Sequence, residues 1–153
     1  MDSVSTQVLA AAAKAAISTL VRASTAQEAT KQVLDWAAAA GRTVVDLSPS
    51  YGSDLRGELS VGGEPLVSGR ALPPWVAAVV EAEGPQLLLL PDVVAASALL
   101  PSTNISVLRG LLKDRRLPAG EMPRTCFVVA TAAKGEGLVP GLPGDAVMHI
   151  DLS

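Results

Sequence analysis

The sequence predicts an α/β domain in three layers, with helices on both faces of a parallel β-sheet. Segments with helical apolar spacing alternate along the chain with short apolar strands, which is the pattern of repeated βα units. The strands expected at 86–90 and 125–131 are apolar throughout rather than at every second residue, as is typical of strands buried on both faces. A chain of 153 residues is long enough for one such domain with its own core.

The first element expected is a helix over residues 3–21, which are rich in alanine and place apolar side chains on one face. Asp2 or Ser3 can cap its start. The end of this helix stays open, because the β-branched residues in ISTLVR (17–22) also suit a short strand.

A second helix is expected over residues 26–40. Its apolar stripe includes Val33 and Trp36, and Gly41 follows as a C-terminal glycine should. The run TVVDL (43–47) comes directly afterwards and reads as a buried strand.

The middle of the chain predicts a loop and then a helix. Residues 51–72 are rich in glycine and suit a loop or a small hairpin around Gly62 and Gly63. A helix is expected over 74–83, because proline is favourable in a first turn, where its missing N–H costs nothing.

The rest of the chain predicts three further strands and one helix. The strands are QLLLL at 86–90, TCFVVAT at 125–131 and MHIDL at 148–152. The helix is expected at 105–113, between the first two of them.

Composition excludes several functional classes. The single cysteine, Cys126, lies in an apolar strand, so an internal disulfide is impossible and a buried structural position is expected. One cysteine and one histidine cannot form an ordinary zinc site. The net charge of −3 gives no general footprint for nucleic acid, and no run of about 20 apolar residues suits a membrane span. The N-terminus lacks the pattern of a secretory signal, so a cytoplasmic location is expected.

The order and spacing of these pieces resemble a known family over residues 36–152. The matching runs are GRTVVDLS, SDLRG, LPPWVAAVVEAEG, LLLLPD, LRGLLKDRRLPAGEMP, CFVVATAA and LPGDAVMHIDL. Together they resemble the nucleotide-binding core of AAA+ ATPases, within the MoxR-like branch. The resemblance implies a P-loop-type αβα fold whose five-stranded parallel sheet has the order 5-1-4-3-2, with residues 17–22 as the central first strand. It also implies a single core domain over 1–153, entered through a helix at 1–16 and lacking the family's C-terminal lid domain.

The resemblance places a phosphate-binding loop at residues 23–30, where the required residue types are missing. Such a loop needs glycines whose N–H groups surround the phosphates, a lysine for the terminal phosphates and a hydroxyl for magnesium. Ala23 stands for the first glycine, Glu28 for the second and Ala29 for the lysine, while Thr30 alone keeps its type. Lys31 comes one position late. An ordinary helix start, with Ser24 or Thr25 as cap and Glu28 at the capping-box position, fits this stretch better.

The other positions implied for ATP chemistry are also altered. The family carries two adjacent carboxylates after the third strand, and here Pro91 replaces the first and Asp92 the second. Ala132 stands where a polar side chain would position water. Val147 or Met148 stands where an arginine would reach a neighbouring subunit, and we expect a structural role for His149.

The sequence therefore predicts a catalytically inactive module of AAA+ type, with no enzymatic activity, cofactor or metal, that binds proteins as a scaffold or regulatory subunit. Self-association or docking on another AAA+ protein is the expected mode, without a membrane, nucleic acid or ATP as partner. Tyrosine, tryptophan and arginine dominate protein interfaces. The candidate contact residues are Tyr51, Leu55, Arg56, Trp75, Arg109, Lys113, Arg115 and Arg116.

Two alternatives remain open at this stage. One is a nucleotide sensor or weak ATPase with an irregular phosphate loop, in which Thr30, Lys31 and Asp92 contact the nucleotide. The other is a nucleic-acid-binding module that uses the basic residues between Arg109 and Arg124. A solvated helix end also explains that basic group.

Overall fold

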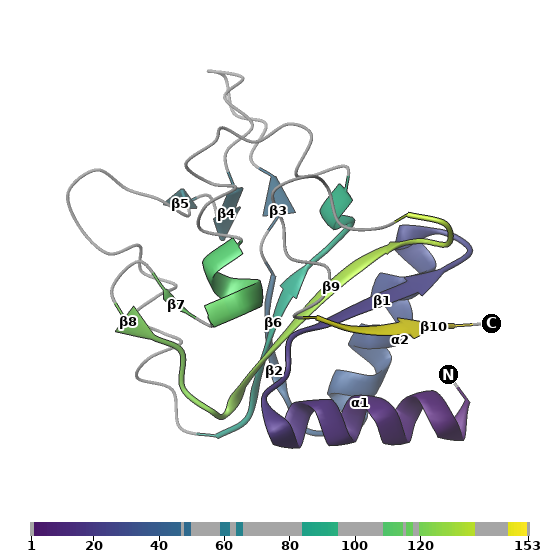
Figure 1. Cartoon of the computed structure of the whole chain (residues 1–153), viewed down its shortest axis with the longest axis horizontal. Coiled ribbons are helices and arrows are strands. Elements are labelled where there is room, and N and C mark those ends of the chain that lie inside the picture. Colours follow the sequence, from purple (N-terminus) through teal and green to yellow (C-terminus); the bar gives the residue numbers. More distant parts are fainter. Residues whose placement is uncertain are drawn as a thin grey trace.

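The computed structural model describes residues 2–46, 48–49, 59–61, 64–65, 84–94, 109–114, 116–117, 120–136 and 147–152. Five strands form one all-parallel sheet (Figure 1). They are β1 (Thr19–Ala23), β2 (Thr43–Asp46), β6 (Gln86–Leu90), β9 (Cys126–Ala133) and β10 (Met148–Asp151). The order across the sheet is β10-β1-β9-β6-β2. Counted along the chain, these strands have the order 5-1-4-3-2, so the predicted α/β class and strand order are confirmed.

The first helix is shorter than residues 3–21. Helix α1 (Ser3–Ala15) begins at Asp2, whose side chain accepts a hydrogen bond from the Ser5 N–H at 2.7 Å. It ends at Ala16, which adopts a left-handed conformation with φ 57°. The β-branched residues that follow enter β1, so the stretch whose state the sequence left open is a strand from Thr19 onward.

Helix α2 (Ala26–Ala39) agrees with the predicted span to within one residue. Thr25 caps its start, because the Thr25 hydroxyl accepts a hydrogen bond from the Glu28 N–H at 3.1 Å. Gly41 follows its end with φ +71°, a conformation that glycine adopts without strain. The predicted inward stripe of α2 is buried.

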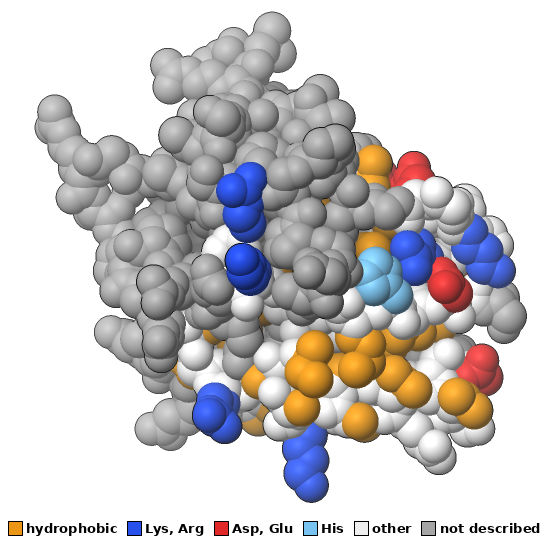
Figure 2. Space-filling model, in the orientation of Figure 1, with side chains coloured by type: hydrophobic (Ala, Val, Ile, Leu, Met, Phe, Trp, Pro, Cys, Tyr) orange, Lys and Arg blue, Asp and Glu red, His pale blue; other side chains and the backbone are white. Residues whose placement is uncertain are grey.

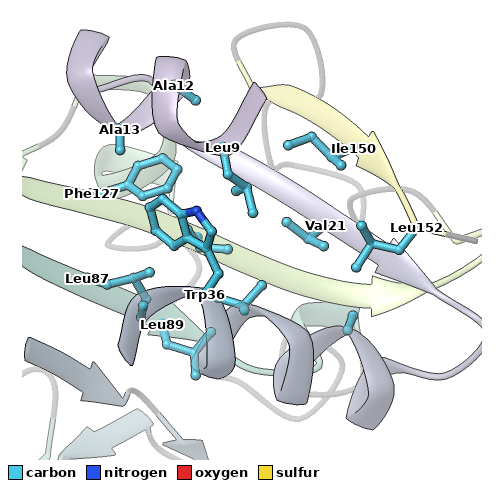
Figure 3. Close-up of a cluster of buried hydrophobic side chains, with 14 of the residues drawn as sticks. Leu9, Ala12, Ala13, Val21, Trp36, Leu87, Leu89, Phe127, Ile150 and Leu152 are labelled. Carbon is cyan, nitrogen blue, oxygen red and sulfur yellow. The ribbon is translucent and has the colours of Figure 1, made fainter. Parts of the chain in front are cut away.

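Both described α-helices cover the same face of the sheet (Figure 3). Side chains of α1 and α2 meet those of β1, β6, β9 and β10 in one apolar cluster. At its centre the Trp36 and Phe127 rings meet edge to face, with centroids 5.8 Å apart. Trp36 therefore packs in the core, and Cys126 is buried as its apolar neighbours indicate.

The opposite face of the sheet is also buried over the central strands, whereas His149 and Asp151 of the edge strand β10 are exposed. Leu20, Leu88 and Val128 point away from the α1 and α2 cluster and are almost completely hidden from solvent. This explains why β6 and β9 are apolar throughout, as the sequence analysis inferred. The helix predicted at 74–83 lies outside the described residues. Of the helix predicted at 105–113, the structure describes residues 109–113, where the π-helical turn η1 (Gly110–Asp114) forms.

Short antiparallel strands complete the described chain. The strands β3 (Ser48–Pro49), β4 (Leu59–Val61) and β5 (Glu64–Pro65) form a small antiparallel sheet in this order, and the pairing of β4 with β5 agrees with the hairpin alternative for residues 51–72. The pair β7 (Arg116–Leu117) and β8 (Gly120–Glu121) was not predicted from the sequence. Among the described helices, none has the length and apolar character needed to cross a bilayer.

Candidate functional site

A cavity of about 360 Å³ lies at the carboxyl edge of the parallel sheet, where open α/β folds usually hold their ligands. One wall is the first two turns of α2, and the other is the turn that follows β6. The lining residues are Ala26, Gln27, Thr30, Lys31, Pro91 and Asp92. The structure therefore brings together Thr30, Lys31 and Asp92, which sequence analysis named as one candidate set.

A chain of hydrogen bonds joins three elements beside this cavity. The Asp92 N–H donates to the Thr131 hydroxyl at 3.0 Å, and the Thr131 and Thr30 hydroxyl oxygens lie 2.8 Å apart. The Thr30 hydroxyl donates to the Ala26 carbonyl at 2.8 Å. Because Thr30 gives its only proton to Ala26, Thr131 must donate to Thr30. Both hydroxyl protons are therefore used within the protein, and neither is left for a ligand.

Thr131, in the middle of these hydrogen bonds, was not predicted as a site residue from the sequence. It is fully buried on β9, opposite Val21 of β1, in a strand otherwise composed of apolar residues and Cys126. A hydroxyl in such a strand is itself a signal, because a buried polar group requires a hydrogen-bond partner. The resemblance assigned the polar, water-positioning residue of this strand to Ala132, which is also fully buried but faces the other side of the sheet. The polar residue at this edge is instead Thr131, one position earlier in the strand.

The connection between β1 and α2 contains only Ser24 and Thr25. A loop of the G-x-x-x-x-G-K type needs several residues between strand and helix to wrap a phosphate in backbone N–H groups. Here the Thr25 hydroxyl already takes the Glu28 N–H, which is the cap that the sequence predicts. The Glu28 carboxylate accepts from the Gln32 side chain at 3.1 Å and lies exposed on α2.

The residues aligned with the first glycine and the lysine of a phosphate loop belong to the core. Ala23, at the end of β1, is 1% exposed and Ala29 is fully buried, and both belong to the apolar cluster under the sheet. A lysine at position 29 would place its ammonium group among apolar side chains, at a large desolvation cost. The cationic side chain at the cavity is that of Lys31.

The turn after β6 places one carboxylate at the cavity. Asp92 has φ 47°, a left-handed conformation that aspartate tolerates better than most residues. Its N–H is held by Thr131. Pro91 lines the cavity beside it and supplies no side-chain ligand, so the carboxylate stands without an adjacent acidic residue.

A second polar group lies where β1 and β10 end. The Arg22 guanidinium donates to the Asp151 carboxylate at 2.8 Å and to the Glu136 carbonyl at 3.0 Å, and the Glu136 carboxylate accepts from the Ala133 N–H. These bonds tie the edge strand β10 and the turn after β9 to β1. The arginine is therefore held by residues of its own chain.

At the opposite edge of the sheet, Arg42 bridges two strands. Its guanidinium donates to the carbonyls of Gln86 at 2.8 Å and Thr125 at 3.2 Å, and it lies 6.0 Å from the Trp36 ring centroid and 5.8 Å from that of Phe127. Burial lowers the pKa of Arg42 below its ordinary value. The role of Arg42 is structural, because its donors satisfy backbone carbonyls at the starts of strands.

Among the described residues, the candidate contact residues and the positions before and in the last strand do not line this cavity. Tyr51, Leu55, Arg56, Trp75 and Arg115 lie outside the described residues, and Arg116 belongs to β7. Arg109 and Lys113 are exposed at η1. At the last strand, Val147 is buried, Met148 is half-buried and His149 is exposed. Within the described part of the chain, no group of three or more His, Cys, Asp or Glu side chains could hold a metal ion.

Comparison of the chain with protein-family models, with curated proteins and with solved structures gave no match.

Proposed function

We propose that this chain is a catalytically inactive binding module on an AAA+-like core, acting in the cytoplasm as a scaffold or regulatory subunit. The observation that carries the proposal is the two-residue connection between β1 and α2. It leaves no loop to surround a phosphate, and its threonine is already used as a helix cap. A fold of this class without its phosphate loop retains surfaces for binding but not the means of hydrolysis.

Two further observations support the absence of hydrolysis. The hydroxyl protons of Thr30 and Thr131 are both donated within the protein. Asp92 has no carboxylate beside it in the sequence, where the family has a pair that holds magnesium and activates water. A variant that restores the acid, Pro91→Asp, should therefore gain no ATP hydrolysis.

Helix α1 offers a surface for protein binding. Val4, Val8, Ala11 and Ala15 follow one another at helical spacing along one side of α1. Val4, Ala11 and Ala15 are exposed, with Val4 67% exposed, and Val8 is half-buried against the core. Figure 2 shows apolar side chains gathered over α1 and the adjoining strand β10. The stripe has its large residues in the first half and its small residues in the second. It is therefore complementary to itself when a second copy runs antiparallel, as a two-fold interface requires.

The test is the molar mass of the purified chain in solution, measured by light scattering over a range of concentrations. We expect self-association that is weakened in Ala11→Glu, which places a charge in the stripe. Ala10→Glu is the matched control, because Ala10 is also exposed on α1 but is turned about 100° away. A wild-type chain that stays monomeric and joins no complex with candidate partner ATPases would refute the proposal.

A second candidate function, nucleotide sensing without hydrolysis, is favoured by the convergence of Thr30, Lys31 and Asp92 on one cavity. Calorimetric titration with ATP and magnesium distinguishes the two. Micromolar binding of ATP would support nucleotide sensing and contradict a scaffold that acts without nucleotide. The scaffold proposal expects no heat of binding, because the chain lacks the phosphate loop.

A further inference from the structure

We propose that the cavity between α2 and the Pro91–Asp92 turn binds a small zwitterion of the α-amino acid class. The ligand carboxylate would lie at α2 and its ammonium group at Asp92. This inference goes beyond the proposed function and does not rest on it, since a scaffold needs no such ligand.

The first observation is the pair of opposite charges on the two walls. Lys31 belongs to α2 and Asp92 to the turn after β6, and both line the cavity. The one ion pair among the described residues joins Arg22 to Asp151, so Lys31 and Asp92 are not paired with each other. A ligand that carries both charges can satisfy both walls at once, and charge-assisted hydrogen bonds are stronger than neutral ones.

The α2 wall suits a carboxylate. Among the described residues, the N–H groups of Ala26 and Gln27 have no acceptor, whereas those of Glu28 and Ala29 are bound by Thr25. These free groups lie at the positive end of the helix dipole, and Lys31 adds a full charge one turn further along the same wall. The α2 side of the cavity therefore combines backbone donors with a cation.

The opposite wall suits an ammonium group. The Asp92 carboxylate supplies hydrogen-bond acceptors, and its backbone is fixed by the bond from its N–H to Thr131. Pro91 and Ala26 give the rest of the lining an apolar surface that contacts carbon atoms of a ligand. The carboxylate is thus the group in this lining that recognises a cation.

Charge and size exclude the main competitors. A polyphosphate would meet the Asp92 carboxylate across a small cavity, where like charges repel, and a simple amine would make no use of the backbone donors and cation of the α2 wall. A volume of about 360 Å³ lies at the lower end of the range for small-molecule pockets, roughly 300–1,000 Å³. A single amino acid fits this range better than a nucleotide does.

The test is an NMR titration of the full chain, following backbone amide shifts, with three probes. L-leucine carries both charges, N-acetyl-L-leucine only the carboxylate, and L-leucinamide only the ammonium group. We expect L-leucine to shift the amides of Gln27, Lys31 and Asp92, with each analogue binding about tenfold more weakly or worse.

Variants assign each end of the ligand. Lys31→Met should weaken L-leucine but leave L-leucinamide unchanged, and Asp92→Asn should weaken L-leucine but leave N-acetyl-L-leucine unchanged. Asparagine tolerates the left-handed backbone at position 92, so this change removes charge without strain. Lys14→Met on α1 is the control, because Lys14 is exposed and does not line the cavity.

Three outcomes would overturn the proposal. They are the absence of shifts at these amides with L-leucine in the millimolar range, equal binding of L-leucine and both analogues, and displacement of L-leucine by magnesium-ATP. The first two outcomes leave the proposed function intact, whereas the third also contradicts its nucleotide-independent character.

Discussion

Replacing Thr131 by valine tests the hydrogen-bond chain that joins α2, β9 and the turn after β6. Valine keeps the shape of threonine but removes the hydroxyl, which makes two hydrogen bonds at a position with no solvent exposure. Each such bond contributes about 0.5–1.5 kcal/mol net, so the expected loss in the free energy of unfolding is about 1–3 kcal/mol. The Asp92 N–H loses its acceptor as well, which moves the expectation toward the upper end.

Urea unfolding measures this loss as a lower midpoint with an unchanged slope. Thr43→Val is the matched control, because Thr43 is an exposed strand residue and no hydrogen bond of its hydroxyl is seen in the described part of the chain. The free energy of unfolding should change by less than about 0.5 kcal/mol in this variant. The double variant Thr30→Val with Thr131→Val should cost less than the sum of the single variants, by about 0.5–1.5 kcal/mol, because they share one bond. If Thr131→Val unfolds at the wild-type midpoint, or if the two changes add, the chain of bonds does not stabilise the protein as argued.

Three further predictions follow from the caps and the arginines. The hydrogen bond from the Ser5 N–H lowers the pKa of Asp2, so the stabilisation that this cap gives α1 is complete above the unfolded pKa of about 3.9 and is lost as the pH falls through the lower folded pKa. Asp2→Asn should abolish this acid transition, which the Ser5 amide shift follows by NMR. An unchanged transition would contradict the assignment. Arg42→Met should lower the free energy of unfolding by about 1–3 kcal/mol, because it removes the hydrogen bonds from the guanidinium to the Gln86 and Thr125 carbonyls together with two ring contacts. Chemical denaturation measures this loss, and a value below about 0.5 kcal/mol would count against the bridge. Asp151→Asn should change stability by less than about 1 kcal/mol, because the Asp151 carboxylate is 61% exposed, and a larger loss would show that β10 depends on this ion pair more than surface pairs usually allow.

Much of the fold was predictable from the sequence because the strands and helices carry strong local signals. The apolar run of β6 and the stripe of α2 are set by hydrophobic burial, which leaves a periodic pattern in the chain. Gly41 marked the end of α2 because few other residues adopt its conformation. The end of α1 stayed open in the sequence, because the alanines up to Ala16 favour helix whereas the β-branched residues at 17–22 also suit a strand. In the structure the helix ends at the left-handed turn of Ala16.

The candidate site was predictable only in part. Thr30, Lys31 and Asp92 were named by alignment to an expected motif, and the structure places all three at one cavity. The alignment placed Ala29 at the lysine position of the motif, whereas the helical spacing put it on one apolar stripe with Val33 and Trp36, and the structure confirms that this stripe packs in the core. Thr131 escaped notice because its partners lie on α2 and on the turn after β6, far away in sequence.

The sequence by itself determined the alternation of strands and helices, the burial of β6 and β9 on both faces and the lack of a glycine-rich phosphate loop. These depend on residue types and their spacing, and hydrophobic periodicity and backbone preference act over a few residues. Only the tertiary structure decided that Lys31 and Asp92 occupy opposite walls of one cavity and that Thr131 joins those walls. Such contacts arise when parallel strands bring their carboxyl ends to one edge of a sheet, and no local pattern in the chain encodes that meeting.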